Sequence, residues 1–299
     1  MNKIFALLVV CSFVQSAKSQ EVISLYPSTA PGCLEVPDME IASKSSKGNG
    51  RPFVANVTHP TITVYLPKNR NAIRSSVIIC PGGGYSRLSI EDGGYEAAKV
   101  FAEAGIAAFV LKYRTWRDSA YTNYKLAPFQ DLTQALNIVY ANAGKWNIDT
   151  TKIGILGFSA GGHLTSMAAV TFQKYKPAFT LLIYPVISFT DSLTSKTSSS
   201  RSTLLEGVIT DADKRAYSPE LHISKHTPPA FIVHATDDKT SLVGNSIAYY
   251  NGLLANKVPA QLLIYEKGGH GFAMYNKEED KYWFPDALKW LNQNGFYKQ

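Results

Sequence analysis

One stretch of the chain, residues 152–164, places a strand-like run, a tight turn and a helix-like run directly one after another. The apolar residues 153–156 lead into Gly-Phe-Ser-Ala-Gly at 157–161, and small residues follow. Small neighbours let the backbone turn sharply around a central serine and lift its hydroxyl above the end of a sheet. The stretch therefore predicts a nucleophilic Ser159. The alternative is a glycine-rich turn that carries no chemistry.

The rest of the chain alternates between the two kinds of segment. Strands are expected at residues 22–26, 61–66, 76–80, 107–113, 153–156, 180–184, 230–234 and 261–265. Helices are expected at residues 95–104, 128–143, 160–171, 246–255 and 282–292. Such alternation indicates βαβ units. We expect an α/β fold with a mostly parallel central sheet and helices on both faces.

The first 19 residues have the pattern of a secretory signal. Lys3 precedes an apolar run at residues 4–14, and Ala-Lys-Ser at 17–19 offers a cleavage site before Gln20. Lipidation at Cys11 is the alternative. The run is too short to span a bilayer. We expect export to the periplasm or beyond, and one catalytic domain at residues 20–299.

Charge and composition exclude several classes of partner. The formal net charge is +7, but the basic residues are scattered and form no cluster with interleaved aromatic residues, so no nucleic-acid partner is expected. The sequence shows no metal-ligand spacing, no second segment of membrane length and no indication of an oligomeric state. After processing, Cys33 and Cys80 would remain, and a bridge between them is left open.

A serine nucleophile needs a base, and the base needs an acid to orient it. In α/β-hydrolases the chain order is serine, acid, histidine. Asp237 and Asp238 follow the strand expected at 230–234, and His270 stands between glycines after the strand expected at 261–265. We predict His270 as the base and Asp238 as the acid, with Asp237 as the alternative. His163 is expected to pack, and His234 to brace the acid loop.

A glycine-rich loop follows the strand expected at residues 76–80. The run Pro-Gly-Gly-Gly-Tyr at 81–85 offers consecutive amides with no side chains to block a carbonyl, as an oxyanion hole requires. Phosphate binding is the rival interpretation. The run lacks the Gly-Lys-Ser/Thr ending of a phosphate-binding loop, so acyl chemistry is favoured.

Residues 187–228 interrupt the alternation, starting with a stretch rich in serine and threonine. The segment follows the first strand after Ser159, so it would lie near the carboxyl ends of the strands, where ligands bind in α/β sheets. We expect a small cap or substrate loop. A disordered insertion is the alternative.

Four runs in order now resemble those of secreted acetyl-xylan-esterase-like α/β-hydrolases, which are related to hormone-sensitive-lipase-type and dienelactone-hydrolase-like esterases. They lie at residues 81–85, 157–163, 234–239 and 266–272. The resemblance implies the α/β-hydrolase fold and a catalytic triad of Ser159, Asp238 and His270. It also implies oxyanion donors at the amides of Gly83, Gly84 and Ala160, and no cofactor.

The resemblance also implies a substrate. Members of the family typically remove acyl groups, most often acetyl, from plant polysaccharides such as xylan or from their oligosaccharides. A feruloyl esterase, a peptidase-like serine hydrolase and a non-catalytic carbohydrate-binding scaffold are the alternatives. Two positions depart from the family pattern: Pro81 replaces a histidine that braces the glycine loop, and Thr-Ser-Leu-Val at 240–243 replaces a Val-Pro turn.

Overall fold

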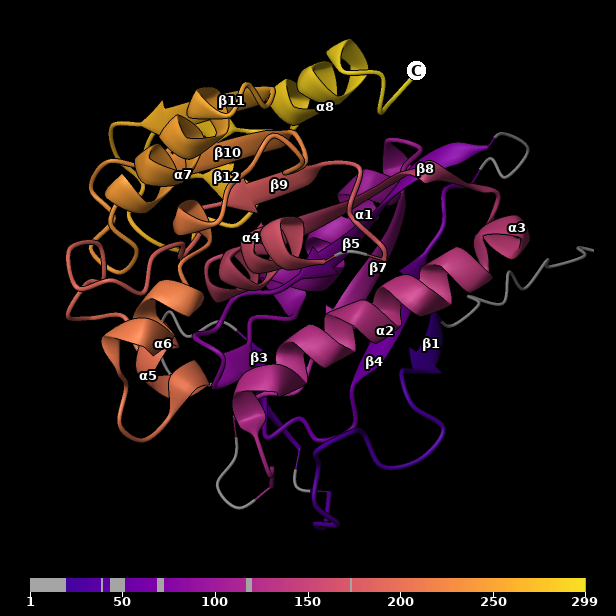
Figure 1. Ribbon diagram of the computed structural model, residues 1–299. Coiled ribbons are helices and arrows are strands. Elements are labelled where there is room, and N and C mark those ends of the chain that lie inside the picture. Colours follow the sequence, from indigo (N-terminus) through magenta and orange to yellow (C-terminus); the bar gives the residue numbers. More distant parts are fainter. Residues whose placement is uncertain are drawn as a thin grey trace, which may run out of the picture.

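A central sheet of eight strands organises the computed structural model, which describes residues 20–38, 40–43, 52–68, 73–116, 120–172 and 174–298 (Figure 1). The expected signal segment, residues 1–19, lies outside the described residues. The strands are β1 (Glu21–Ser24), β4 (Thr61–Tyr65), β5 (Arg74–Cys80), β7 (Ala107–Lys112), β8 (Ile148–Phe158), β9 (Thr180–Ile183), β10 (Ala230–Ala235) and β11 (Ala260–Tyr265).

The strand order is β1-β4-β7-β5-β8-β9-β10-β11. β4 pairs antiparallel with both β1 and β7, and every other neighbouring pair is parallel. Every residue of β9 and β10 is buried, as expected for parallel strands covered on both faces. The expected mostly parallel α/β sheet is confirmed.

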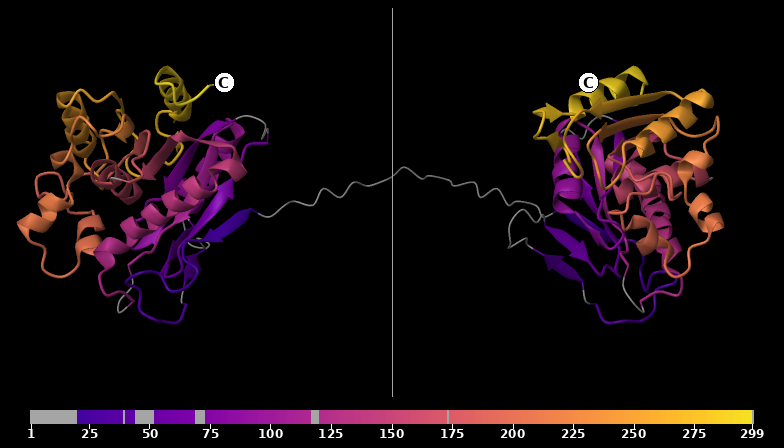
Figure 2. Two further views of the ribbon diagram at one scale, coloured as in Figure 1. Left: turned by 45° about the vertical axis from the view of Figure 1, so that its right-hand side comes forward. Right: turned by 90° about the vertical axis from the view of Figure 1, so that its left-hand side faces the viewer.

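Helices cover both faces of this sheet (Figures 1 and 2). They are α1 (Glu96–Glu103), α2 (Ala127–Ala141), α3 (Ala143–Trp146), α4 (Ala160–Thr171), α7 (Gly244–Ala255) and α8 (Phe284–Gln293). α1 and α8 meet through Phe101 and Phe284, whose ring centroids are 4.8 Å apart. α2 and α4 pack together on the opposite face. Within the described residues, every helix is too short or too polar to cross a bilayer.

Several expected boundaries differ from the structure. The helix expected at 95–104 is preceded by a π-helical turn, η1 (Glu91–Tyr95), and the one expected at 128–143 divides into α2 and α3. The helix expected at 282–292 begins at Phe284, because β13 (Lys281–Tyr282) pairs with β12 (Tyr275–Asn276). Strands of two residues are too short to leave a periodicity in the sequence.

A small second sheet was not predicted. Its strands are β2 (Ile41–Ser43), β3 (Phe53–Ala55) and β6 (Arg87–Leu88), in that order and antiparallel. β2 and β3 lie between the strands expected at 22–26 and 61–66, where no element was expected. Because β6 directly follows the glycine loop, this sheet holds that loop at one side of the main sheet.

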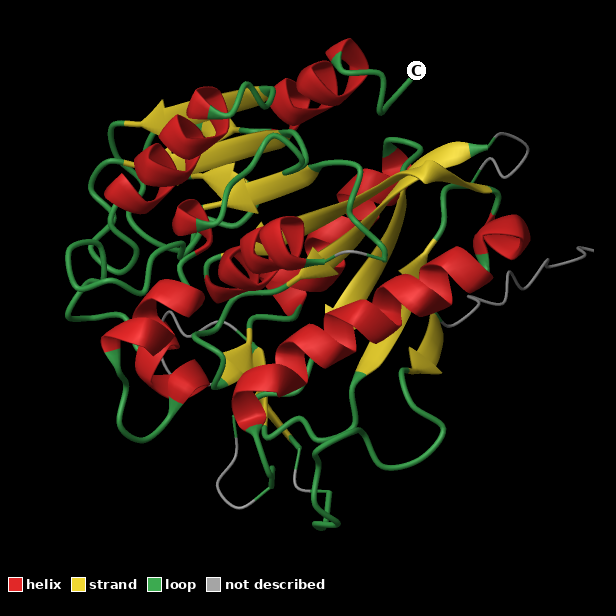
Figure 3. Cartoon of the chain, in the orientation of Figure 1, coloured by secondary structure: helices red, strands yellow, loops and turns green. Residues whose placement is uncertain are grey.

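The segment 187–228 contains short helices at the carboxyl ends of the strands (Figures 1 and 3). They are α5 (Ser200–Leu205), α6 (Asp211–Ala216) and the 3₁₀ turn η3 (Pro219–Leu221). A further 3₁₀ turn, η2 (Tyr124–Leu126), precedes α2. α6 begins with a capping box in which the Thr210 hydroxyl accepts from the Asp213 amide and the Asp213 carboxylate accepts from the Thr210 amide. We call residues 187–228 the cap.

Neither of the two described cysteines forms a disulfide. Cys80 is buried in β5, whereas the backbone of Cys33 forms a β-bridge with Tyr121. The bridge between Cys33 and Cys80 that the sequence left open is therefore absent. Burial raises the pKa of the Cys80 thiol to about 12, which makes it an unreactive core side chain.

Candidate active site

Ser159 lies at the sharp turn between β8 and α4. Its backbone has φ 53° and ψ −118°, a strained conformation for a residue with a side chain. The two flanking glycines make the turn sterically possible. A Cβ on Gly157 would lie 2.2 Å from the Gly161 carbonyl oxygen, and one on Gly161 would lie 2.0 Å from the Cys80 oxygen. Only glycine fits at either position, so this turn has the geometry of a nucleophile elbow.

The loops after β10 and β11 bring Asp238 and His270 to the same edge of the sheet. β9 separates β10 from β8, and all these strands run parallel, so their carboxyl ends lie side by side. The two loops are also joined directly. The Thr236 amide donates to the Tyr265 carbonyl at 2.9 Å, and the Gly269 amide donates to Asp237 Oδ1 at 2.7 Å.

The three side chains of the predicted triad form one continuous chain of hydrogen bonds. Ser159 Oγ lies 2.8 Å from His270 Nε2, and His270 Nδ1 lies 2.7 Å from Asp238 Oδ2. A carboxylate only accepts, so Nδ1 carries the proton and Nε2 accepts from the serine hydroxyl. Asp237 is exposed, and its side chain accepts from the amide of Gly269, next to His270. Of the two adjacent acids, it is Asp238 that contacts His270.

Asp238 is held as a carboxylate by donors on both oxygens. Oδ1 accepts the amides of Thr240 and Ser241 at 2.8 and 2.9 Å, and Oδ2 accepts from His270 and, at 3.2 Å, from His234. Burial alone would raise the pKa of this carboxyl. The hydrogen bonds from His234 and His270 outweigh burial and hold the pKa of Asp238 well below its usual range.

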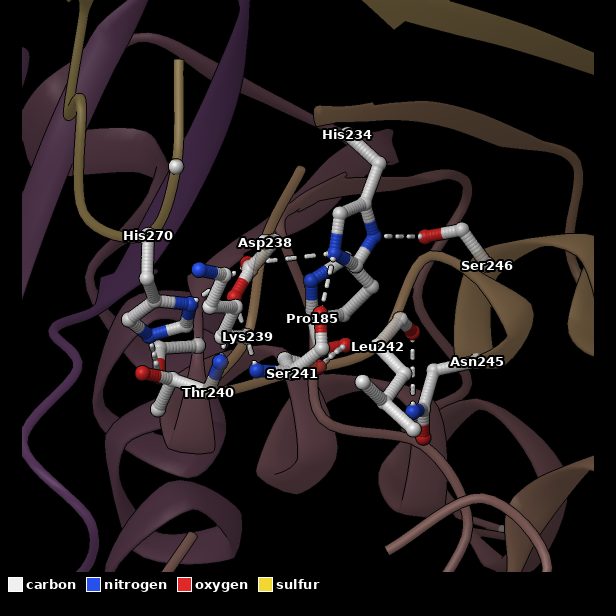
Figure 4. A network of polar contacts seen from close by, with 12 residues as sticks. Pro185, His234, Asp238, Lys239, Thr240, Ser241, Leu242, Asn245, Ser246 and His270 are labelled. Atoms are coloured by element: carbon white, nitrogen blue, oxygen red, sulfur yellow. Dashed lines mark hydrogen bonds and ion pairs between the residues drawn. The ribbon is translucent and has the colours of Figure 1, made fainter. Parts of the chain in front are cut away.

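His234 braces the acid loop, as expected (Figure 4). Its Nε2 lies 2.8 Å from the Ser241 carbonyl oxygen, and its Nδ1 lies 2.6 Å from the Ser246 hydroxyl. The carbonyl can only accept, so Nε2 carries the proton and Nδ1 accepts from Ser246. The loop that replaces the family's Val-Pro turn therefore holds Asp238 through its own amides and through this buried imidazole.

The glycine loop is braced without the histidine that Pro81 replaces. The Tyr113 hydroxyl donates to the Pro81 carbonyl at 2.8 Å, and the Ser89 amide donates to the Gly82 carbonyl at 2.8 Å. The Tyr124 hydroxyl also donates to the Tyr85 carbonyl, at 2.7 Å. Neighbouring tyrosines and backbone groups thus take over the role of the missing side chain.

Three amides are expected to bind an oxyanion, those of Gly83, Gly84 and Ala160. Gly83 and Gly84 line the same cavity as Ser159, and Ala160 begins α4, where the first amides have no acceptor within the helix. No role was predicted for Gly82, yet a Cβ there would lie only 3.0 Å from Ser159 Cβ. Gly82 therefore allows the loop to approach the nucleophile.

The cavity above Ser159 has a volume of about 270 Å³. Phe158, Tyr184 and Ala273 form apolar parts of its wall. The polar parts come from Ser86, Arg87, Asp92, Thr240 and the cap residues 197–200. The cap thus supplies hydroxyl groups to the same cavity that Ser159 lines.

A larger cavity, of about 730 Å³, lies at the opposite edge of the sheet. It is lined by residues where strands begin, among them Arg74, Ser75 and Gly105. Because Ser159 and His270 line the smaller cavity, we take the smaller one as the candidate active site.

Tyr184 is a site residue that was not singled out in the sequence. Its ring meets the His270 ring edge-on at a centroid distance of 5.0 Å, and its hydroxyl accepts from the Ala273 amide at 3.1 Å. It follows β9 directly, so its position at a strand end was the available signal.

Among the described residues, no group of three or more His, Cys, Asp or Glu side chains is arranged to hold a metal ion.

The sequence matches a known family and is similar to named proteins, an esterase and a xylanase among them. The BD-FAE family model matches residues 62–253. The acetylxylan esterase of Xylanibacter ruminicola is 37% identical over 212 residues, which are 70% of this chain and 42% of that protein. Endo-1,4-beta-xylanase B of Butyrivibrio fibrisolvens is 33% identical over 231 residues, 73% of this chain and 35% of that one. The chain therefore spans less than half the length of either relative.

A solved structure resembles almost the whole chain. The acetyl ester-xyloside bifunctional hydrolase from Caldicellulosiruptor lactoaceticus superposes with a TM-score of 0.75 at 27% identity. The superposition covers 93% of this chain and 97% of that one. The α/β-hydrolase architecture thus extends well beyond the part that the family model matches.

Proposed function

Since the chain belongs to the BD-FAE family, we propose that it is a serine carboxylesterase whose catalytic triad is Ser159, His270 and Asp238. One observation carries this proposal. The serine hydroxyl, the imidazole and the carboxylate form an unbroken hydrogen-bonded series, with distances of 2.8 and 2.7 Å, at the wall of a cavity. That arrangement supplies a nucleophile, a base and an orienting acid.

The reaction follows from the positions of these groups. Ser159 Oγ attacks the ester carbonyl while His270 Nε2 takes its proton, and Asp238 stabilises the imidazolium that forms. The amides of Gly83, Gly84 and Ala160 bind the oxyanion. His270 then gives the proton to the departing alcohol. Water next attacks the acyl-enzyme with His270 as base, which releases the acid and restores Ser159.

The proposed substrate is an acetylated oligo- or polysaccharide such as acetylated xylan. The cavity of about 270 Å³ is slightly smaller than the usual range for ligand sites, which favours a small acyl group over a feruloyl group. Hydroxyls of the cap residues 197–200 suit an alcohol that is itself a polyol. The names of the acetylxylan esterase and the acetyl ester-xyloside hydrolase support the same substrate class.

Export belongs to the same proposal. The signal pattern of residues 1–19 would direct the chain out of the cytoplasm, and a polymeric substrate such as xylan is met outside the cell. We propose that residues 20–299 act as one catalytic domain, with residues 187–228 as its cap. N-terminal sequencing of the exported protein tests this, and an N-terminus that still begins at Met1 would refute cleavage.

The activity is tested with Ser159→Ala and a matched serine variant, Ser166→Ala. Ser166 lies on α4, and its hydroxyl donates to the His163 carbonyl. Acetate release from acetylated xylan and hydrolysis of 4-nitrophenyl acetate should fall by roughly 10⁴-fold or more in Ser159→Ala. Both rates should stay within about twofold in Ser166→Ala. Equal rates in Ser159→Ala and wild type would refute the proposal, as would a wild-type serine that does not react with a fluorophosphonate.

A further inference from the structure

His163 lies one helical turn after the nucleophile, and its amide donates to the Ser159 carbonyl at 3.2 Å. Its imidazole is completely buried, and both ring nitrogens have partners. Nδ1 lies 2.7 Å from the Tyr85 hydroxyl, and Nε2 lies 2.8 Å from the Tyr217 carbonyl oxygen. The mechanism above does not use this residue.

The chemistry of the two partners assigns the ring protons. A backbone carbonyl can only accept, so Nε2 donates to Tyr217, and Nδ1 accepts from the Tyr85 hydroxyl. Burial lowers the pKa of His163 to about 4, so the ring is neutral near neutral pH. In the neutral ring, the Nε2 donor is thus paired with the Tyr217 carbonyl, and the Nδ1 acceptor is paired with the Tyr85 hydroxyl.

The Nδ1 partner belongs to the glycine loop. Tyr85 directly follows Gly84, is fully buried and has a positive φ of 64°. Its carbonyl accepts from the Trp116 amide at 2.8 Å and from the Tyr124 hydroxyl, so its backbone is held as firmly as its side chain. Because the Tyr85 ring and backbone are both held, a displaced ring would strain the adjoining Gly83 and Gly84, which line the same cavity as Ser159.

The remaining contacts of the imidazole are with two parts of the cap. The ring of Phe189, near the start of the cap, stacks on the His163 ring at 4.1 Å with an interplanar angle of 10°. Tyr217 lies at the end of α6. The Phe189 amide donates to Ser218 Oγ at 2.8 Å, so these two parts of the cap are joined to each other beside His163.

We propose that His163 is a positioning residue that couples the glycine loop and the cap to the nucleophile through its two ring nitrogens. The hydrogen bond at Nδ1 fixes the position of the glycine loop, and the hydrogen bond at Nε2 fixes the position of the cap. This inference rests on the proposed esterase function and assigns separate kinetic roles to the two hydrogen bonds. A misplaced oxyanion loop weakens interactions made in the transition state, which lowers kcat, whereas a misplaced cap weakens binding of the saccharide, which raises KM.

Two variants remove the contact with the glycine loop. Tyr85→Phe deletes only the hydroxyl. His163→Gln has an amide that reaches about as far as Nε2, so it keeps a donor for Tyr217 and loses the acceptor for Tyr85. In both variants kcat for 4-nitrophenyl acetate and for an acetylated xylo-oligosaccharide should fall roughly 3- to 10-fold, with KM within about twofold.

One variant removes the contact with the cap. The amide of His163→Asn reaches only about as far as Nδ1, so it keeps an acceptor for Tyr85 and loses the donor to Tyr217. We expect KM for the acetylated xylo-oligosaccharide to rise roughly 3- to 10-fold. The kcat/KM for 4-nitrophenyl acetate, which is too small to need the cap, should stay within about twofold.

Tyr297→Phe is the matched control, because its hydroxyl donates to the Ala104 carbonyl at 2.8 Å on the far side of the sheet. It should lower the melting temperature about as much as Tyr85→Phe and leave both kinetic constants unchanged. An unchanged kcat in Tyr85→Phe would overturn the role of Nδ1, and an unchanged saccharide KM in His163→Asn would overturn that of Nε2. The esterase proposal is judged separately, on wild type and Ser159→Ala.

Discussion

The molecule buries two carboxylates, Asp131 and Asp238, and it surrounds them differently. Neither side chain has any exposed surface. Asp131 on α2 faces the guanidinium of Arg114, with Nε 3.0 Å from both carboxylate oxygens and Nη2 2.9 Å from Oδ1. Asp238 faces two imidazoles and two backbone amides. Both carboxylates are paired, as burial requires, but with partners of different kinds.

The two clusters differ in their access to solvent. Arg114 has no exposed surface, and it also donates to the carbonyls of Pro31 and Ala127 and to Gln130. Burial opposes the charge, yet the attraction of Asp131 raises the pKa of Arg114. In the other cluster the His270 side chain is 21% exposed and borders a cavity. A buried carboxylate whose partners are all enclosed can only hold elements together, whereas one whose partner borders a cavity can support proton exchange with a substrate.

The largest expected effect comes from disrupting the cluster of Asp238, His234 and His270, which we call the open cluster. Asp238→Asn places an amide where His270 Nδ1 needs an acceptor, which favours the wrong tautomer of the imidazole. We expect kcat for 4-nitrophenyl acetate to fall about 10⁴-fold. The control is Asp237→Asn, since its remaining oxygen can still accept from the Gly269 amide, and its rate should stay within about threefold. A loss below tenfold in Asp238→Asn would show that Asp238 does not orient the base.

The next largest effect comes from disrupting the cluster of Asp131 and Arg114, which we call the closed cluster. Asp131→Asn leaves the Arg114 charge buried without a counterion, so the free energy of unfolding should fall by about 3 kcal/mol or more in urea titrations. The kcat of the protein that remains folded should not change. Glu21→Gln, which breaks the exposed ion pair with Lys145, should cost no more than about 1 kcal/mol. A kcat that falls along with stability would mean that the two clusters are not separate.

The open cluster was predictable from the sequence because its parts are local motifs. The turn at Ser159, the glycines around His270 and the strands before each loop can all be read from neighbouring residues. The fold followed from the same alternation of strands and helices. Choosing Asp238 over Asp237 was harder, because adjacent residues in a loop point in directions that no periodicity records.

The closed cluster was not predicted, because its partners carry no local signature. Arg114 lies in the loop after β7, Asp131 lies on an ordinary helix, and Pro31 belongs to another loop. The contacts of His163 with Tyr85 and Tyr217 were missed for the same reason, although packing was expected. The approach of Gly82 to Ser159 and the small sheet of β2, β3 and β6 likewise depend on contacts between distant segments.

A third expected effect concerns His163, which belongs to neither cluster. Tyr124 reaches the carbonyls of Tyr85 and, at 3.3 Å, Arg114, and Tyr85 in turn reaches His163. The pKa of His163 is about 4 in the fold and about 6.5 in the unfolded chain. Between these values the unfolded chain binds a proton that the folded one does not, so stability is complete above about pH 6.5 and falls as the pH drops towards 4.

The loss at His163 should amount to about 3 kcal/mol across that range. It is measured as the free energy of unfolding of wild type and His163→Asn at several values between pH 4 and 7. The variant lacks the titrating group, so the difference between the two curves should shrink as the pH falls. Curves that stay parallel would show that burial does not keep His163 neutral.

The smallest expected effect comes from removing a hydrogen bond of the closed cluster while its ion pair is kept. The Tyr26 hydroxyl donates to Asp131 Oδ1 at 3.1 Å, and its ring lies 5.7 Å from the Arg114 guanidinium carbon. Tyr26→Phe keeps the ring and removes only the hydroxyl, so the free energy of unfolding should fall by about 1 kcal/mol while kcat stays unchanged. In an Asp131→Asn background the same substitution should cost less, because the acceptor is no longer charged. Equal costs in the two backgrounds would mean that Tyr26 stabilises the protein through packing and not through Asp131.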